Sequence, residues 1–534
     1  MIKSFGPIFL CAAILIGLPS QGISMSLEEG KRLHNEAFEL RKKGGSPEQL
    51  KLAASKYEEA LKAFRELGFT EGIGRACTNL GDMYLQAGQY ETAERYWIEA
   101  LDAFTESRDE KKQAEILLNL GTVHVSLGQS RKAEQEFEKG LEISRRLSIK
   151  PAEAIFLNNL GHVYTHVGQH AKAKEYCEKS IELSREVKDL PTEGRALNNL
   201  GSVFKAEGEY SKARLSYEQS LDLKKKTGDL NGEGQVLNNL AAIFAAQGDY
   251  PKAAELYERT LDIYGKTNNV RGQAQTMTNL GNVYSALGRY SQAIDLHEKA
   301  LNIFEQVKDL TGVGQALTNL GDTYTNQGRY DGALRSYEKA LAKAKETGNK
   351  NGEAVILNNL GLVAASAAGD YALAVRRYEE ALAIFNQTGD KGGSASCFVN
   401  LGDTYTGWGQ YHKAMEFYRK ASEMFGGMGN IRGEGQTLRS LGTMYSHWGQ
   451  YAKALEYYQQ ALAIQQRLKD RKGEGLTLAA IGQIHERLGE DEEALRNYER
   501  ALAIYDEIGA DPSLMRRLVS MLYLETGRLD KAEP

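Results

Sequence analysis

The sequence predicts an all-α fold, a solenoid built from consecutive antiparallel pairs of helices. Three observations predict it. A glycine recurs at intervals of 40 residues, apolar residues within each interval fall at helical spacing, and a second glycine divides each interval in two. Because the repetition runs along almost all of the 534 residues, we expect a stack of similar units rather than several unlike domains.

The first recurring glycine usually follows a leucine and lies in the first helix of each unit. Its spacing is 40 residues with one step of 41, and Ala241 replaces it once. A second glycine follows seven residues later, as at Gly208, and we expect it to end the helix by adopting a positive φ angle. The first series comprises Gly81, Gly121, Gly161, Gly201, Gly281, Gly321, Gly361, Gly402, Gly442 and Gly482.

Small residues are expected to bring the two helices of each unit close together. In the unit around Gly201, Phe204 lies on one face of the first helix, while Ala213 and Tyr217 share one face of the second. Gly201 and Ala213 let the two backbones approach, and the aromatic rings fill the space around that contact. The alanine recurs in every full unit, at Ala93, Ala133, Ala173, Ala213, Ala253, Ala293, Ala333, Ala374, Ala414, Ala454 and Ala494.

The connections between units pair a glycine with a residue that caps helices. We expect the glycine to stop one helix, and the Asp or Asn side chain after it to cap the next. The clearest pairs are Gly228-Asp229, Gly348-Asn349, Gly389-Asp390 and Gly429-Asn430.

The first 24 residues predict an export signal. Lys3 gives a short positive region, residues 5–18 are apolar, and small residues precede Met25. The apolar run is too short for an ordinary transmembrane helix. We therefore expect export to the periplasm, the cell envelope or the exterior, with an uncleaved membrane anchor as the alternative.

Composition and cysteine placement narrow the function classes further. The net charge is -5, with acidic and basic residues interspersed, which argues against nucleic acid and anionic membranes as partners. Beyond Cys11 in the leader, Cys77, Cys177 and Cys397 lie in units far apart along the chain, so we expect three small core residues and no disulfide framework.

These positions form the pattern Leu-Gly-x2-Tyr, then Gly, then Ala-x3-aromatic, which resembles the tetratricopeptide repeat across residues 26–534. The unit is longer than the common form of about 34 residues, leucine usually replaces the first tryptophan, and the terminal proline is missing. These departures resemble the longer-helix repeats of cell-polarity adaptors of the LGN/Pins type, of kinesin light chains and of bacterial CHAT-domain proteins. The resemblance implies a right-handed superhelix whose first helices line a concave groove.

The expected organisation has four parts. Residues 1–24 form a signal peptide, 25–69 a divergent helix pair, 70–510 eleven repeats, and 511–534 an incomplete final repeat. The chain ends shortly after a further unit begins, so we expect either a truncation or a continuing domain.

One polar residue repeats on the face that the resemblance assigns to the groove. By resemblance to other tetratricopeptide grooves, such asparagines hydrogen-bond the backbone of an extended peptide, because a side-chain amide both donates and accepts. The alternative is that they bridge neighbouring repeats. This asparagine ladder comprises Asn79, Asn119, Asn159, Asn199, Asn239, Asn279, Asn319, Asn359 and Asn400.

Residues one helical turn from the ladder are expected to determine which peptide binds. They are mixed and mostly neutral, so an acidic peptide tail is not clearly favoured. We assign this role to Arg75, Arg195, Gln235, Gln275, Gln315 and Asp322.

Other chemistry is not expected. His162 and His166 have a spacing that can chelate a metal, but no third ligand accompanies them. Pairs such as Gly232 and Gly234 recur with the repeat and lack the strand and the lysine of a phosphate loop, so we expect them to permit tight packing against the preceding helix. Because no nucleophile–base set is visible, we predict no enzyme activity, no cofactor and no small-molecule substrate.

The sequence therefore predicts an exported interaction scaffold that binds a peptide or partner helix in its groove. A second hypothesis is the sensing arm of a larger enzyme, a CHAT-type caspase-like protease, whose catalytic domain would follow residue 534. A third is self-association through the uncapped last repeat.

Overall fold

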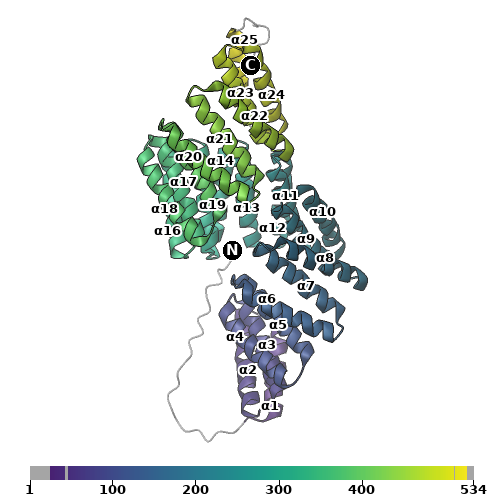
Figure 1. Cartoon of the computed structure of the whole chain (residues 1–534). Helices are drawn as coiled ribbons and strands as arrows, with labels where there is room; N and C mark the ends of the chain where they lie inside the picture. Colours follow the sequence, from purple (N-terminus) through teal and green to yellow (C-terminus); the bar gives the residue numbers. More distant parts are fainter. Residues whose placement is uncertain (1–24, 43–45, 510–511, 526–534) are drawn as a thin grey trace. The chain divides into compact units, whose positions relative to one another are not determined.

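A computed structural model of the chain describes residues 25–42, 46–509 and 512–525, and it folds them into 25 helices without a strand (Figure 1). The expected signal peptide, residues 1–24, lies outside the described residues. Within the described part, none of the helices combines the length and the hydropathy that crossing a membrane requires.

In chain order the helices are α1 (Leu27–Lys42), α2 (Pro47–Glu66), α3 (Thr70–Gln86), α4 (Tyr90–Glu106), α5 (Glu110–Ser126), α6 (Ser130–Arg146), α7 (Lys150–His166), α8 (His170–Val187), α9 (Leu190–Ala206), α10 (Tyr210–Thr227), α11 (Leu230–Ala246), α12 (Tyr250–Lys266), α13 (Val270–Ala286), α14 (Tyr290–Gln306), α15 (Leu310–Asn326), α16 (Tyr330–Glu346), α17 (Lys350–Ala368), α18 (Tyr371–Thr388), α19 (Lys391–Gly407), α20 (Tyr411–Gly427), α21 (Ile431–His447), α22 (Tyr451–Leu468), α23 (Arg471–Leu488), α24 (Asp491–Glu507) and α25 (Ser513–Glu525).

The chain divides into two units, residues 1–192 and 193–534. In unit 1, α1 packs on α2, α3 on α4, α5 on α6 and α7 on α8. In unit 2 the same antiparallel pairing runs from α11 and α12 through to α23 and α24, and each second helix also contacts the first helix of the next pair. The all-α architecture of paired helices is as the sequence predicts.

The predicted contact between small residues and aromatic rings holds the pairs of unit 2 together. A Cβ atom on Gly321 would lie only 2.4 Å from Cε1 of Tyr337, so the ring occupies the space that a larger residue would need. The same contact joins Gly201 to Tyr217. All eleven recurring alanines of the second helices are fully buried. The sequence argument for close helix packing is confirmed.

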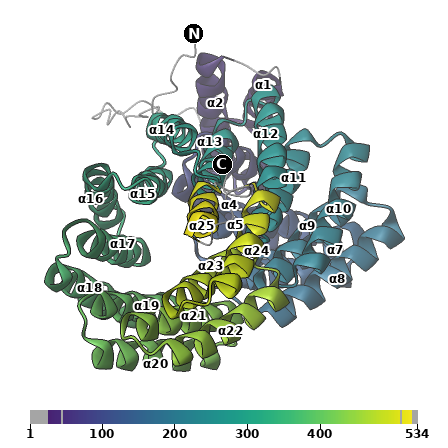
Figure 2. The same ribbon diagram turned by 90° about the horizontal axis from the view of Figure 1, so that it is seen from above.

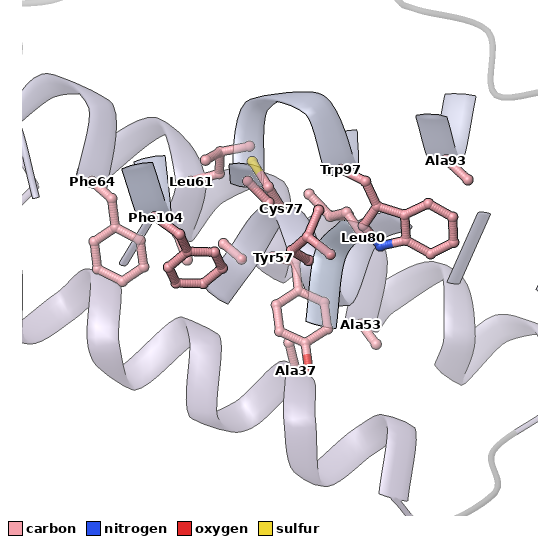
Figure 3. Close-up of a cluster of buried hydrophobic side chains, with 14 of the residues drawn as sticks. Ala37, Ala53, Tyr57, Leu61, Phe64, Cys77, Leu80, Ala93, Trp97 and Phe104 are labelled. Atoms are coloured by element: carbon pink, nitrogen blue, oxygen red, sulfur yellow. The ribbon is translucent and has the colours of Figure 1, made fainter. Parts of the chain in front are cut away.

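Unit 1 uses the same contact with a larger ring. Trp97 is buried against Gly81, where a Cβ would lie 2.4 Å from its Nε1. Figure 3 shows Trp97 beside Leu80, with Cys77 in the same apolar cluster. The thiols of Cys77, Cys177 and Cys397 are free and buried, as predicted.

The turns between units behave as their sequences predict. Gly228 has a φ of 68°, in the left-handed region that glycine adopts at little cost. Asp229 then caps α11 by accepting a hydrogen bond of 2.8 Å from the backbone N–H of Gly232. The stop and the cap therefore fix where α11 begins.

The Gly-x-Gly pairs differ from expectation in one respect. Both glycines permit close packing, but only the first contacts the preceding helix: a Cβ on Gly232 would lie 2.7 Å from Cδ of Lys224 on α10. A Cβ on Gly234 would lie 2.6 Å from Tyr264 on the following helix α12. The prediction considered only one neighbour, whereas each first helix packs between two second helices.

The first helices line the inner side of the curve in unit 2. Helices α11, α13, α15, α17, α19 and α21 each contact the next first helix directly, the last of them α23. In a curved stack, the inner helices are closer together than the outer ones. Figure 2 shows this curve, with the teal helices from α11 leading round through α18 to the yellow α24.

Candidate functional site: an amide strip on the first helices

Three adjacent first helices of unit 2 carry the densest set of predicted binding residues. Helices α11, α13 and α15 each present a Gln and, one turn later, an Asn of the ladder, and residues four apart share a helix face. We call these six residues the amide strip: Gln235, Asn239, Gln275, Asn279, Gln315 and Asn319.

Exposure separates the two halves of the amide strip. The three glutamines are exposed, while the three asparagines are half-buried, as is every other asparagine of the ladder. The asparagines therefore lie at the boundary between the packed interior and the inner surface. The glutamines can contact a partner without first losing a packing contact.

Part of the ladder bridges neighbouring repeats in unit 2. The amide nitrogen of Asn239 donates to Oδ1 of Asn198 at 3.0 Å, and that of Asn279 donates to Oδ1 of Asn238 at 3.2 Å. Asn400 donates in the same way to Asn358 at 3.0 Å. Each acceptor is the residue that precedes a ladder position in the repeat before, so the bridging role weighed in the sequence analysis is present in the structure.

Two ladder positions depart from this pattern. Asn359 donates to Oδ1 of Asp322 at 2.9 Å, and the same carboxylate oxygen accepts a hydrogen bond of 2.6 Å from the Tyr337 hydroxyl. Burial raises the pKa of Asp322, and the hydrogen bond from Tyr337 partly offsets this. The buried Nδ2 of Asn319, by contrast, has no hydrogen-bond partner in the described part of the chain. The carboxylate of the half-buried Asp322 is therefore already engaged by two side chains of the protein, one of them a ladder residue.

In unit 1 the first ladder residue is held by α1. The Oδ1 atom of Asn79 accepts a hydrogen bond of 2.9 Å from Arg41, and its Nδ2 lies 3.1 Å from the Arg75 carbonyl and 3.2 Å from Nε2 of His34. The exposed Arg75 side chain forms an ion pair of 2.7 Å with Glu71. The amide of Asn79 is thus largely used within unit 1.

The remaining predicted residues occupy comparable places. Asn119, Asn159 and Asn199 are half-buried, and Arg195 is exposed. Asn159 accepts a hydrogen bond of 3.1 Å from the amide of Asn158, its neighbour in sequence.

The two histidines of this pair in unit 1 lie close together, and the described residues supply no third metal ligand beside them. The Nε2 atoms of His162 and His166 lie 3.1 Å apart, and burial, with a smaller effect of His166, lowers the pKa of His162 to about 4. Among the described residues, no group of three His, Cys, Asp or Glu side chains has the geometry of a metal site.

The acceptors of the bridging bonds are functional residues that the sequence prediction did not include. Asn198, Asn238 and Asn358 each precede a ladder residue and were not singled out. The doubled asparagine in the motif Asn-Asn-Leu was the visible signal. Two adjacent amides on a helix point in different directions, so one can face the next repeat while the other faces the groove.

The fold and the strip define a class: a helical repeat scaffold with polar residues repeated along its inner surface. A family profile for the tetratricopeptide repeat matches residues 73–146, 153–226, 232–306, 312–387, 366–426 and 434–507. These stretches span well over half of the sequence, so the chain belongs to the tetratricopeptide repeat family.

Solved structures are similar to parts of this chain. A Rap protein complexed with competence and sporulation factor is 15% identical, with a TM-score of 0.52 over 67% of this chain and 99% of that one. Aspartyl phosphate phosphatase F from Bacillus subtilis is 14% identical, with a TM-score of 0.45 over 66% and 93% of the two chains. A STAND protein with a tetratricopeptide repeat sensor from Pyrococcus horikoshii is 19% identical, with a TM-score of 0.41 over 62% and 55%.

Among curated proteins, none matches this sequence. The similarity to the Rap structure, at this low identity, shows a shared helical-repeat fold.

Proposed function

We propose that the chain is a scaffold that binds an extended peptide segment of a partner protein along the amide strip of unit 2. The observation that carries this proposal is the strip itself: exposed glutamines and half-buried asparagines on three first helices that contact one another. A peptide crossing these helices would meet one Gln–Asn pair per repeat.

The bridging hydrogen bonds support this role. The bond from Asn239 to Asn198 uses one N–H of the amide and fixes its orientation, as does the bond from Asn279 to Asn238. Each amide has a second N–H and two acceptor lone pairs. A held amide loses less conformational freedom on binding, so preorganisation favours affinity. Bridging and peptide binding are therefore compatible at Asn239 and Asn279.

The expected recognition is of the peptide backbone. A side-chain amide matches a peptide group whatever the neighbouring side chains, and each such hydrogen bond contributes about 0.5–1.5 kcal/mol net. Several repeats must therefore act together to give useful affinity. Gln235, Gln275 and Gln315 would add selectivity through polar side chains of the ligand.

The comparisons agree with a binding role at a coarse level. The Rap protein that shares the fold was solved with competence and sporulation factor bound, so at least one scaffold of this architecture holds a partner.

The test uses peptides selected from a displayed random library against the purified chain, with affinities measured by calorimetry. Replacing Asn239, Asn279 and Asn319 together with alanine should weaken binding by at least ~10-fold, because three backbone contacts are lost. The matched control is Asn302→Ala, an exposed asparagine on α14. Methylation of a single backbone nitrogen of the peptide should weaken binding at each position where a side-chain amide of the strip accepts a hydrogen bond from that N–H.

Two results would count against the groove. Equal affinity of the triple variant and the unmodified protein would show that the peptide binds elsewhere. Loss of helicity in the triple variant, measured by circular dichroism, would show that these asparagines serve only to join repeats.

We also propose that the protein is exported. The support is the sequence of residues 1–24, with Lys3 before an apolar run. Mass spectrometry of the protein from its native cells should find a mature chain that begins near Met25, and an intact N-terminus in the cytoplasmic fraction would contradict export.

A further inference from the structure

Distant repeats of unit 2 meet at the turn between α11 and α12. Nη2 of Arg432, at the start of α21, lies 3.5 Å from the carbonyl oxygen of Ala246. Nζ of Lys472, at the start of α23, lies 6.0 Å from the centre of the Tyr250 ring. Repeats that are five and six units apart in sequence thus come side by side, with the teal α11 near the yellow-green helices in both views (Figures 1 and 2).

A cavity of about 510 Å³ lies at this contact. One wall comes from the α11–α12 turn, with Tyr250, and the other from α21, from the end of α22 and from the start of α23. The charged and polar side chains that line it are Arg432, Arg439, Gln465, Asp470 and Lys472, together with Gln436. Its volume falls in the range typical of small-molecule sites, about 300–1,000 Å³.

Cations outnumber carboxylates in this cavity. Asp470 caps α23 by accepting a hydrogen bond of 3.1 Å from the N–H of Gly473, and it lies 3.8 Å from Nη1 of Arg432. Neither the Arg439 guanidinium nor the Lys472 ammonium forms an ion pair within 4.0 Å among the residues that the structure describes. Among the lining side chains three positive groups therefore share one carboxylate, which favours a positive potential across the cavity; the Asp403 carboxylate, on which Arg439 also acts, is not part of the lining.

A buried acceptor in the cavity wall also lacks a donor. Gln465 is 5% exposed, and its Oε1 receives no hydrogen bond from the described residues. A buried polar atom without a partner is costly, and such atoms in native proteins often mark a binding position. A ligand that fits this wall should offer an N–H or O–H group as well as negative charge.

We propose that this cavity binds a small organic anion, one that carries a carboxylate or phosphate group together with a hydrogen-bond donor. Arg439 and Lys472 contact the anionic group, Arg432 adds charge at the rim, and Gln465 accepts from the donor. An extended peptide fits less well, because the cavity is bounded by a turn and three helix ends and does not run across successive repeats.

Binding at this place would couple the ligand to the closure of unit 2. The anion would contact α21 and α23 on one side and the α11–α12 turn on the other, so it would hold the two walls together. Burial lowers the pKa of Lys472, with Asp470 acting in the opposite direction, and a bound anion would favour the charged ammonium. This site is separate from the amide strip and does not depend on the peptide-binding proposal.

The test is calorimetric titration of the full chain with two probes, O-phospho-L-serine and L-glutamate, which offer a phosphate or a carboxylate beside an ammonium donor. L-Glutamine is the control for net negative charge, because it keeps the α-carboxylate and the ammonium of glutamate and lacks only the side-chain carboxylate. We expect saturable binding of at least one acidic probe, with a rise in the melting temperature. The Arg439→Gln and Lys472→Gln variants should each bind about tenfold more weakly or worse.

The control variant is Arg419→Gln, which removes one positive charge from an exposed position on α20 and should bind like the unmodified protein. Gln465→Leu should also weaken binding, because it removes the acceptor. If Arg439→Gln melts at a lower temperature without ligand, its weaker binding can come from lost stability. The affinity of Lys472→Gln for the probes is then the measurement that tests the site.

Three outcomes would overturn the site: no saturable binding of either acid at millimolar concentration, equal affinity for L-glutamine, or unchanged binding by Lys472→Gln. The Asn239, Asn279 and Asn319 alanine variant should bind the probes normally. Failure of the peptide groove and failure of this cavity are therefore distinguishable.

Discussion

Two successive junctions between repeats in unit 2 differ in how they hydrogen-bond the core aromatic residue and the ladder asparagine. At the junction between the α15–α16 pair and α17, Asp322 accepts hydrogen bonds from Tyr337 and Asn359, which connects the core aromatic residue to the ladder. At the junction before it, between the α13–α14 pair and α15, the equivalent residues are Asn282, His297 and Asn319. Both ring nitrogens of His297 and the Nδ2 of Asn319 lack partners in the described part of the chain.

The difference between the two junctions shows that the ladder position alone does not determine what an asparagine does there. Asn239 and Asn279 find an asparagine acceptor in the preceding repeat, but the residue at that place for Asn319 is Thr278, whose hydroxyl donates instead to the Ala274 carbonyl at 3.0 Å. The role of each asparagine is therefore decided by a residue about 40 positions away.

The largest expected difference between the two junctions is in pH dependence. Burial lowers the pKa of His297 to about 4, whereas in the unfolded chain a histidine titrates near ~6.5. The unfolded state therefore binds the extra proton first, so stability is fully present above pH ~6.5 and falls as the pH drops toward 4, by about 3 kcal/mol in all. Urea unfolding at a series of pH values measures this.

The matched variant is His297→Phe, because Phe137 occupies the equivalent place against Gly121 in unit 1. Its unfolding midpoint should depend less on pH between ~6.5 and ~4 than that of the unmodified protein. An identical pH dependence in the two proteins would mean that His297 is not the group responsible.

A smaller effect is expected from breaking the intact junction. Tyr337→Phe removes the hydroxyl that donates to Asp322 and should reduce the free energy of unfolding by about 1–2 kcal/mol, because the acceptor carries charge. The same change should raise the pKa of Asp322, since the hydrogen bond from Tyr337 lowers it.

The control for that change is Tyr458→Phe, whose hydroxyl contacts the neutral Thr443 hydroxyl at 3.1 Å. Denaturant unfolding at neutral pH should show the smaller loss for Tyr458→Phe. A loss as large as that of Tyr337→Phe would show that the carboxylate adds nothing to the junction.

The fold could be predicted because its causes are local and repeated. Gly321 and Tyr337 are separated by 16 positions, and each unit repeats the same spacing of small and aromatic residues, so one unit explains the others. Glycine turns such as Gly228 likewise depend only on their own backbone angles.

The site could be predicted only in part because its causes cross between repeats. The ladder positions were visible, but whether Asn319 or Asn359 finds a partner depends on Thr278 and Asp322 in the repeat before. The contact between Arg432 and Ala246 could not be predicted from the sequence, because it depends on the rotation accumulated over five repeats. No local sequence motif encodes this accumulated rotation.

The smallest expected effect comes from repairing the deficient junction. Thr278→Asn places an amide where Asn198 and Asn238 lie in the two repeats before, so Oδ1 of the new side chain can accept from Asn319. We expect the free energy of unfolding to rise by about 0.5–1.5 kcal/mol, since a buried donor gains a partner. Thr278→Ala is the control, because it removes the hydroxyl without supplying an acceptor and should not stabilise the protein. If Thr278→Asn and Thr278→Ala change stability equally, the unpaired amide of Asn319 is not what distinguishes the two junctions, and the bridging bonds contribute little to holding repeats together.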